Sequence, residues 1–405
     1  MNGVIRKLLL LSIIFSSFSA WLALHDYVRL PMIFLGIAIV LALCSNPSTL
    51  LRKIPNTSVE RLFLSIFLFI FACSFIVNSV INPTTKLMSN GVATILIIFT
   101  FYYILSSLFY SYLTKDDVLS ALGTGGLVLM GIIFVDELLV NIFDIRLALF
   151  FRSGEILHSY FNWGAWIASS APTEEPGYSA MSLNILAPFS ILKYKKYRLL
   201  LCCTYIALLF GLCSSQGIAS FGLCSIVTFL TLKHASKLKL KIIGYCFLFA
   251  FVIALFIGFD NIASFLDAMS FWSKVTMSGE TLSDVSRFSA WQQAISDGND
   301  APFIGKGPGY GKYLINGYLS TFLGFYAMYG VIAAVAFIIF WLIIYRKCFK
   351  LEKNIRPYLI YTFTTTFIIG MVIDQLHMFI FWLLPSILVV LSNPTLLTKK
   401  NKYDS

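Results

Sequence analysis

An arginine in a short polar segment is the residue of this sequence that most clearly indicates chemistry. Arg287 lies in S-D-V-S-R-F-S-A-W-Q-Q-A-I-S-D-G, residues 283–298. Ser283 or Asp284 can cap the start of a helix there, and Gly298 can end it. A guanidinium group binds two oxygens of a phosphate at once. The segment therefore predicts a helix that presents a phosphate-binding side chain.

The side of this helix on which Arg287 lies follows from the apolar spacing. Val285, Phe288, Trp291 and Ile295 recur at helical intervals and predict the buried stripe. Arg287 flanks that stripe, next to Phe288 and one turn from Trp291. Pairing with Asp284 at the protein surface is an equally good reading of the arginine.

A turn rich in glycine follows the helix. In P-F-I-G-K-G-P-G-Y-G, residues 302–311, Gly305, Gly307, Gly309 and Gly311 alternate around Pro308. Glycines let a backbone approach a ligand closely and point N–H groups at an anion. The G-x-x-x-x-G-K-[ST] pattern of a nucleotide-binding loop is not present in the sequence. On the sequence alone, a plain tight turn is the favoured interpretation.

Two adjacent carboxylates, Glu174 and Glu175, precede a second apolar run. At a membrane boundary, partial loss of water raises the pKa of a carboxyl group, which can then act as a base near neutral pH. A solvated acidic pair that marks the start of a helix is the favoured alternative. His158 lies among aromatic residues and is more typical of an interfacial side chain than of a catalyst.

The elements that must position these residues are membrane helices. The sequence is 58% hydrophobic and 12% charged, with a mean hydropathy of +0.83, far outside the range of soluble proteins. About twelve apolar runs approach the length of a bilayer span. We predict an all-α integral membrane protein with spans at 7–24, 30–45, 62–81, 90–112, 118–140, 178–192, 199–213, 217–232, 242–258, 318–345, 357–374 and 378–393.

The basic residues predict the orientation. Most of the 30 Lys and Arg fall in alternate loops and in both terminal segments, which by the positive-inside rule face the cytoplasm. Arg6 and Lys7 precede the first span, which is predicted to be a retained helix. The net charge of +11 is thus a topology signal, and no nucleic-acid partner is expected.

Two outer loops are long, and long structured loops are usually functional. They divide the chain into N-terminal membrane helices (1–140), a first loop (141–177), central helices (178–258), a second loop (259–317) and C-terminal helices with a cytoplasmic tail (318–405). Short helices are expected within both loops.

Together these residues resemble a known family, the bacterial O-antigen polymerases of the Wzy type, within the O-antigen polymerase and ligase superfamily. Arg287 and Gly298 match its R-x10-G pattern, and residues 302–307 match P-x-x-G-x-G. Asn316 and Tyr318 match N-x-Y-L, before a closing Gly330. E-P-G-Y-S-A enters a span at Glu175. In two places the sequence departs from the ligases: Ile315 precedes Asn316, where ligases have His-Asn, and Gln216 stands where they have arginine.

The resemblance implies a glycosyltransferase of the GT-C type that needs no metal or other cofactor. It would act in lipopolysaccharide biosynthesis at the periplasmic face of the bacterial inner membrane. There it would transfer a growing glycan from undecaprenyl diphosphate onto a new lipid-linked repeat unit. A chain-length regulator and a flippase are partners by analogy with the family.

The resemblance also assigns roles to residues. Arg287 would stabilise the diphosphate leaving group. Glu175 is the first choice for the base, followed by Glu174 and His158. The remaining substrate-binding candidates are Arg152, Gly298, Gly305, Gly307, Gly309, Tyr310, Asn316 and Tyr318.

Two other functions stay open. An O-antigen ligase would transfer finished glycan to lipid A-core. A flippase or other transporter of lipid-linked oligosaccharides would carry charges at mid-membrane sites between related halves. Here the charges gather in two unlike outer loops, which favours an enzyme.

Overall fold

The computed structural model describes residues 1–19, 21–22, 28–81, 85–147, 162–163, 166–173, 175–231, 282–313, 317–374 and 378–393. Over these residues the protein is mostly helical. The helices in chain order are α1 (Asn2–Ile14), α2 (Leu30–Ser45), α3 (Ser58–Ile81), α4 (Thr85–Ile98), α5 (Leu105–Tyr112), α6 (Lys115–Phe143), α8 (Pro176–Lys193), α9 (Arg198–Gly211), α10 (Ser215–Thr231), α14 (Leu282–Asp300), α15 (Thr321–Cys348), α16 (Arg356–Val372) and α17 (Phe379–Leu391).

Short elements join these helices. Three-residue or four-residue 3-10 turns are η1 (Pro47–Thr49), η3 (Lys195–Tyr197) and η4 (Tyr310–Tyr313), and η2 (Phe99–Ile104) is a π-helical stretch between α4 and α5. The first long loop contains an antiparallel ribbon of β1 (Asn162–Trp163) and β2 (Trp166–Ile167). Short helices were expected in both loops. The described part of the second loop bears this out with α14, whereas that of the first shows a ribbon.

Four helical stretches of the described chain are long and apolar enough to cross a membrane: Ser58–Ile81, Met88–Tyr112, Lys115–Phe143 and Thr321–Cys348. Leu30–Ser45, Gln216–Thr231 and Phe379–Leu391 are shorter apolar helices. An apolar run in lipid must satisfy its backbone internally, which a helix does. From 30–45 onward, the predicted spans within the described chain coincide with helices. The first, predicted at 7–24, is wrong in its second half, because α1 ends at Ile14 and a turn follows. The predicted run at 242–258 lies outside the described residues. The total of twelve spans stays a prediction.

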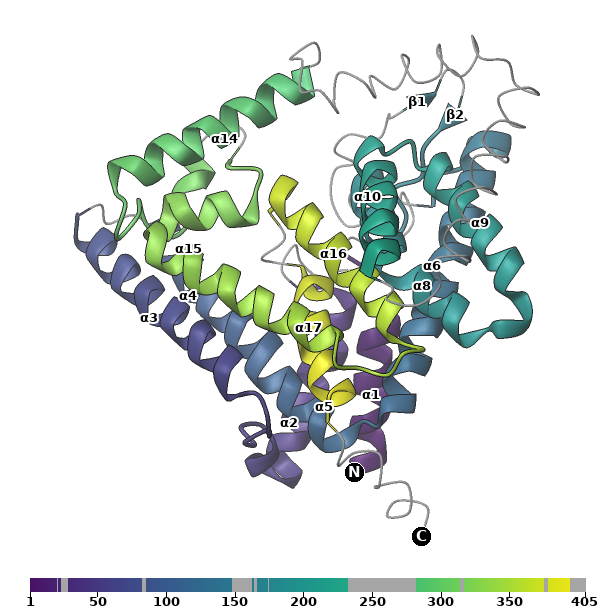
Figure 1. The fold of residues 1–405 in the computed structure, drawn as a ribbon, viewed down its shortest axis with the longest axis horizontal. Coiled ribbons are helices and arrows are strands. Elements are labelled where there is room, and N and C mark those ends of the chain that lie inside the picture. The colour runs from purple at the N-terminus through teal and green to yellow at the C-terminus, as the bar shows by residue number, and fades with distance from the viewer. Residues whose placement is uncertain are drawn as a thin grey trace.

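The helices form two side groups around a centre (Figure 1). On one side α3 packs along α15, and α14 lies across the outer part of α15. On the other side α6 packs along α8, with α9 and α10 against them. Helix α16 contacts α15, α8 and α10 and so joins the two sides.

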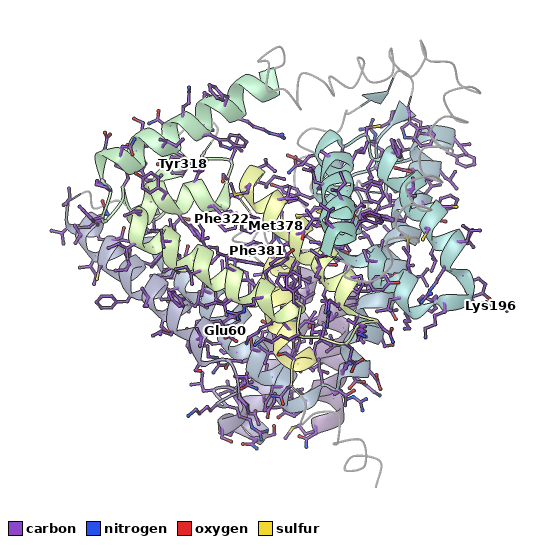
Figure 2. The ribbon with its side chains drawn as sticks, in the orientation of Figure 1. Glu60, Lys196, Tyr318, Phe322, Met378 and Phe381 are labelled. Atoms are coloured by element: carbon purple, nitrogen blue, oxygen red, sulfur yellow. The ribbon has the colours of Figure 1, made fainter. Side chains whose placement is uncertain are left out.

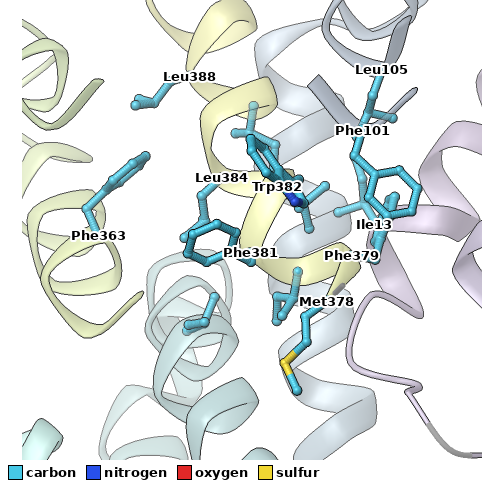
Figure 3. Close-up of a cluster of buried hydrophobic side chains, with 14 of the residues drawn as sticks. Ile13, Phe101, Leu105, Phe363, Met378, Phe379, Phe381, Trp382, Leu384 and Leu388 are labelled. Carbon is cyan, nitrogen blue, oxygen red and sulfur yellow. The ribbon is translucent and has the colours of Figure 1, made fainter. Parts of the chain in front are cut away.

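Helix α17 is the core of the bundle, because every one of its residues is buried. A helix that is apolar all round requires such an environment. Figure 3 shows its aromatic side chains among those of neighbouring helices. The ring of Phe381 lies 4.7 Å from that of Trp341, and the ring of Phe379 lies 5.4 Å from that of Phe101.

Three ion pairs join segments that are predicted to be cytoplasmic. Arg6 binds Asp117 through two nitrogens, at 2.6 and 3.1 Å, while Lys115 pairs with Glu352 and Lys347 with Glu60. These pairs gather the starts of α1, α3 and α6 with the end of α15 and the turn that follows it, at one end of the bundle. The side of the membrane that this end faces stays a prediction.

Candidate functional site

Helix α14, which carries Arg287, packs on α15 through small residues. Ala290, Ala294 and Asp297 are buried, whereas Phe288 is 51% and Ile295 46% exposed. The predicted stripe through Phe288 and Ile295 is therefore wrong. Because α14 approaches α15 closely, the contact face requires small side chains, and Phe288 and Ile295 point away. Trp291 of the predicted stripe is half-buried, and its Nε1 donates to Leu319 O at 3.4 Å.

Gly298 shows how close this approach is. A Cβ atom at this position would lie 2.3 Å from the ring of Tyr326 on α15. The glycine therefore does not end the helix, as predicted, but lies inside it and accommodates an aromatic ring. The helix continues to Asp300.

Arg287 lies half-buried on this same contact face. Gly298 lies eleven positions after Arg287, about three helical turns, so both lie on one side of α14, roughly 16 Å apart along its axis. The R-x10-G spacing therefore places both residues on one face of α14. Gly298 packs against Tyr326 at one end of this face, and Arg287 carries the guanidinium at the other end. The side chain of Asp284, the alternative partner of Arg287, lies outside the described residues.

Hydrogen bonds fix the anchored end of α14. The Tyr318 hydroxyl donates to Asp297 Oδ2 at 2.9 Å, and Gln293 Nε2 donates to Asp297 Oδ1 at 3.1 Å. Tyr326 donates to Asn299 Oδ1 at 2.7 Å. Tyr318 lies between α14 and α15 (Figure 2). Burial, and then the hydrogen bond with the Asp297 carboxylate, raise the pKa of the Tyr318 phenol, which keeps it a hydrogen-bond donor.

The glycine-rich turn joins α14 to a break in α15. At Gly330 the backbone has φ 83° and ψ 175°, which interrupts the helix. In an unbroken helix the N–H of Val331 would bind the carbonyl of Ala327. Here the Val331 N–H donates to Pro302 O at 2.8 Å instead. A Cβ atom at Gly330 would lie 2.5 Å from the backbone of Phe303.

The same turn also satisfies the carbonyls that precede the break. Lys306 N donates to Ala327 O and Gly307 N to Met328 O, each at 2.9 Å. A broken membrane helix is tolerated where such partners exist. These N–H groups of the turn therefore bind protein carbonyls.

The glycines of the turn allow this close packing. Gly305, Gly307 and Gly309 all have positive φ, between 71° and 95°. A Cβ atom would lie 2.2 Å from Met328 C at Gly305, 2.7 Å from Asn78 Cβ at Gly307 and 2.4 Å from Asn90 Nδ2 at Gly309. Asn78 also donates to Gly305 O at 3.3 Å. This arrangement suits the tight-turn interpretation. Binding of diphosphate by Gly309 or the half-buried Tyr310 stays a prediction.

Glu175 precedes the first turn of α8 and is half-buried. Its carbonyl accepts Ser179 N at 3.2 Å and the Thr173 hydroxyl at 2.7 Å. The Thr173 and Ser179 hydroxyls are 2.9 Å apart. The backbone of Glu175 is thus fixed on α8, whereas Arg287 belongs to α14 on the other side group. Arg152, His158, Glu174 and Asn316 lie outside the described residues.

Sequence reasoning missed two carboxylates inside α6. Asp136 is 3% and Glu137 5% exposed. Asp136 accepts the Ser169 hydroxyl at 2.6 Å and Leu147 N at 3.1 Å, which ties the first loop to the helix. Glu137 Oε1 is buried with no hydrogen-bond partner in the described part of the chain. Two adjacent acids within an apolar run were the signal that could have identified them.

No protein-family model and no curated protein matches this sequence.

Proposed function

We propose that this chain is a polysaccharide polymerase of the O-antigen type, acting on sugars linked to a polyprenyl diphosphate. A hydroxyl oxygen of the new repeat unit attacks the anomeric carbon of the growing glycan. The bond from that carbon to the diphosphate oxygen breaks, and the electron pair leaves with the diphosphate. A protein carboxylate takes the hydroxyl proton.

The position of Arg287 carries this proposal. Its helix is held to α15 by the Gly298–Tyr326 contact and by the Asp297–Tyr318 hydrogen bond. Three turns along the same face, Arg287 is half-buried and is directed toward the side on which α14 meets the membrane helices. In this proposal, α14 would present the guanidinium of Arg287 to the lipid diphosphate.

The chemistry requires a cation of this kind. Negative charge grows on the diphosphate oxygens as the sugar leaves, and a fixed donor stabilises that charge without reorganising. Arginine suits two oxygens of one phosphate better than lysine, because its guanidinium is planar and forked.

Glu175 is the proposed base. Glu175 stands just before the first turn of α8, and hydrogen bonds from Thr173 and Ser179 fix its backbone. Its side chain therefore starts from a fixed point, which we predict to lie at the outer boundary of the membrane. Glu174, His158 and Arg152 remain candidates for contacts to the sugars and the diphosphate.

Arg287→Lys and Arg287→Ala test the proposal. Each variant is expressed in a strain that lacks the gene, and the lipopolysaccharide is separated by length. We expect both to lose long-chain product at unchanged protein level, since removal of one such donor slows a reaction by about 10²–10³. Gln292→Ala, on the exposed face of α14, is the matched control and should leave chain length normal. Normal chain length in Arg287→Ala would exclude this arginine from the chemistry.

Glu175→Gln separates the base from the diphosphate site. It keeps the size of the side chain and removes its ability to accept a proton, so we expect no polymer from this variant. Full activity in Glu175→Gln would move the role of base to another residue. In the same strain, lipid A-core that carries a single repeat unit indicates a polymerase, whereas bare core indicates a ligase.

Transport is the second candidate, and Asp136 and Glu137 are the observation in its favour. Carboxylates buried within a membrane helix are typical of ion and substrate pathways. Purified protein in vesicles would be tested for movement of a fluorescent lipid-linked oligosaccharide between leaflets. Movement that depends on Glu137, with no glycan extension, would replace the polymerase proposal.

A further inference from the structure

The turn that follows α14 carries two large apolar side chains in an exposed position. Phe303 is 67% and Ile304 40% exposed. The backbone beneath them is nevertheless closely packed, because Pro302 O accepts Val331 N at 2.8 Å and a Cβ atom at Gly330 would lie 2.5 Å from Phe303 O. The two apolar side chains are therefore held outward by a fixed turn, and a surface of this kind requires a partner.

Helix α15 presents an apolar side to the outside from this turn onward. Val331 is 39%, Val335 47% and Leu342 52% exposed, and the three recur at helical intervals along one side of α15. This helix is long and apolar enough to cross a membrane, so its exposed apolar side faces lipid. Because Pro302 binds Val331, the backbone of Phe303 lies at the beginning of this lipid-facing side.

The depth of the turn follows from the two helices that hold it. Lys347, which pairs with Glu60, lies where α15 ends in charged residues, and such residues mark a membrane boundary. Gly330 precedes Lys347 by seventeen positions, about 26 Å along α15. On α3, Asn78 follows Glu60 by eighteen positions, about 27 Å, and donates to Gly305 O in the turn. The hydrocarbon core of a bilayer is about 30 Å thick, so both helices place the turn just inside the opposite boundary.

We propose that Phe303 and Ile304 enter the hydrocarbon of the bilayer, at the boundary opposite the three ion pairs. The partner of this surface is the acyl chains of membrane lipids. Residues 302–305 then form a re-entrant turn, although the sequence predicts an extramembrane loop there. Backbone that is not helical is tolerated at such a depth where protein groups satisfy it. The bonds from Lys306 N and Gly307 N to carbonyls of α15 meet this requirement.

The charged neighbours of the turn fit a boundary position. Lys306 Nζ pairs with Asp300 Oδ2 at 3.1 Å, so the two charges cancel, and the Asp300 side chain is 60% exposed. A lysine can lay its alkyl stem on an apolar surface while its amine reaches water. The turn therefore has an apolar tip and a polar base. Its insertion does not depend on the polymerase proposal, since Arg287 takes no part in it.

Fluorescence quenching on the full-length protein in lipid nanodiscs tests this placement. A coumarin amino acid replaces Phe303 in one variant and Ile304 in another, so that a folding defect in one leaves the other. The quenchers are a phospholipid with a nitroxide near its headgroup, a phospholipid with a nitroxide near the chain end, and aqueous iodide. We expect both labels to lose more fluorescence to the shallow nitroxide than to the deep one, and to be protected from iodide.

Labels at two other positions are the matched controls. Val335 lies five positions beyond Gly330 on the lipid-facing side, about 7 Å deeper, and should respond more strongly to the deep nitroxide. Lys353 is exposed in the turn after α15 and should be quenched by iodide. Each labelled protein must unfold at the temperature of the wild type before its quenching is compared.

Two results would overturn the proposal. Iodide quenching of the turn labels as strong as that at Lys353, with no loss to either nitroxide lipid, would place the turn in water. Protection from iodide without quenching by nitroxide lipid would show that protein, such as a second copy of this chain, covers the turn. Quenching by the shallow nitroxide together with normal chain length in Arg287→Ala would retain the re-entrant turn and reject only the polymerase chemistry.

Discussion

Substitution of Gly305 by alanine should open the junction between the glycine-rich turn and α15. The residue has φ +71°, where a side chain costs about 1–2 kcal/mol. The new Cβ would lie 2.2–2.4 Å from the backbone of Met328 and Tyr329, atoms that no side-chain rotation can move. The turn must therefore shift away from α15.

The shift breaks hydrogen bonds whose contribution can be added. Lys306 N to Ala327 O and Gly307 N to Met328 O each contribute about 1 kcal/mol. With the strain at φ, the junction loses about 3–4 kcal/mol. That is a large fraction of the stability of an ordinary domain.

Gly317→Ala is the matched control. Gly317 also has positive φ, at +60°, but the nearest atom to its Cβ would be Gly311 O at 3.7 Å, an ordinary contact. This variant therefore keeps the strain and lacks the clash, and we expect it to cost only about 1–2 kcal/mol.

Hydrogen exchange measured by mass spectrometry on the purified protein reports the difference. In Gly305→Ala the amides of 303–308 and 327–332 should exchange about a hundredfold faster than in wild type, as a loss of about 3 kcal/mol implies. Gly317→Ala should raise exchange in these segments by about thirtyfold at most. Equal exchange in the two variants would refute the view that the turn is locked against the break in α15.

The remaining predictions concern buried polar groups, each with a paired control. Lys347→Met leaves the buried Glu60 carboxylate unpaired and should destabilise the protein by about 3–5 kcal/mol. Lys115→Met should cost at most about 1 kcal/mol, because its partner Glu352 is 57% exposed. Thermal unfolding in detergent compares the two variants, and similar unfolding midpoints would contradict the difference in burial. Tyr318→Phe removes a hydrogen-bond donor from the buried Asp297 and should lower the free energy of unfolding by about 1–3 kcal/mol. Tyr326→Phe should cost less, because its hydrogen bond to Asn299 is exposed. A larger loss of stability in Tyr326→Phe would argue that Asp297 does not hold α14 in place. Glu137→Met should leave the unfolding temperature unchanged or raise it, because the substitution removes a buried oxygen without a hydrogen-bond partner in the described chain. Asp136→Asn should lower the unfolding temperature, because one of two accepting oxygens is lost. A marked loss of stability in Glu137→Met would show that this carboxyl group has a structural partner.

The sequence determined where the helices lie, because a long apolar run in lipid must satisfy its own backbone hydrogen bonds. The runs at 30–45, 62–81 and 118–140 therefore match α2, α3 and α6 closely. The presence of a helix at α14 was also readable, but its ends were not: the helix begins at Leu282, so Ser283 and Asp284, predicted as caps, lie inside it. These features depend on neighbours in the chain.

Only the tertiary structure decided which faces meet. Hydrophobicity did not identify the buried face of α14, because contact with α15 selects Ala290, Ala294 and Gly298 for their small size, and Phe288 and Ile295 point outward. The glycines at 305, 307 and 309 are likewise explained only by the tertiary structure. They allow the turn to pack closely against the break in α15 at Gly330 and against Asn78 and Asn90, which come from distant parts of the chain. Such juxtapositions depend on how closely backbones approach in three dimensions, which the order of residues along one segment does not encode.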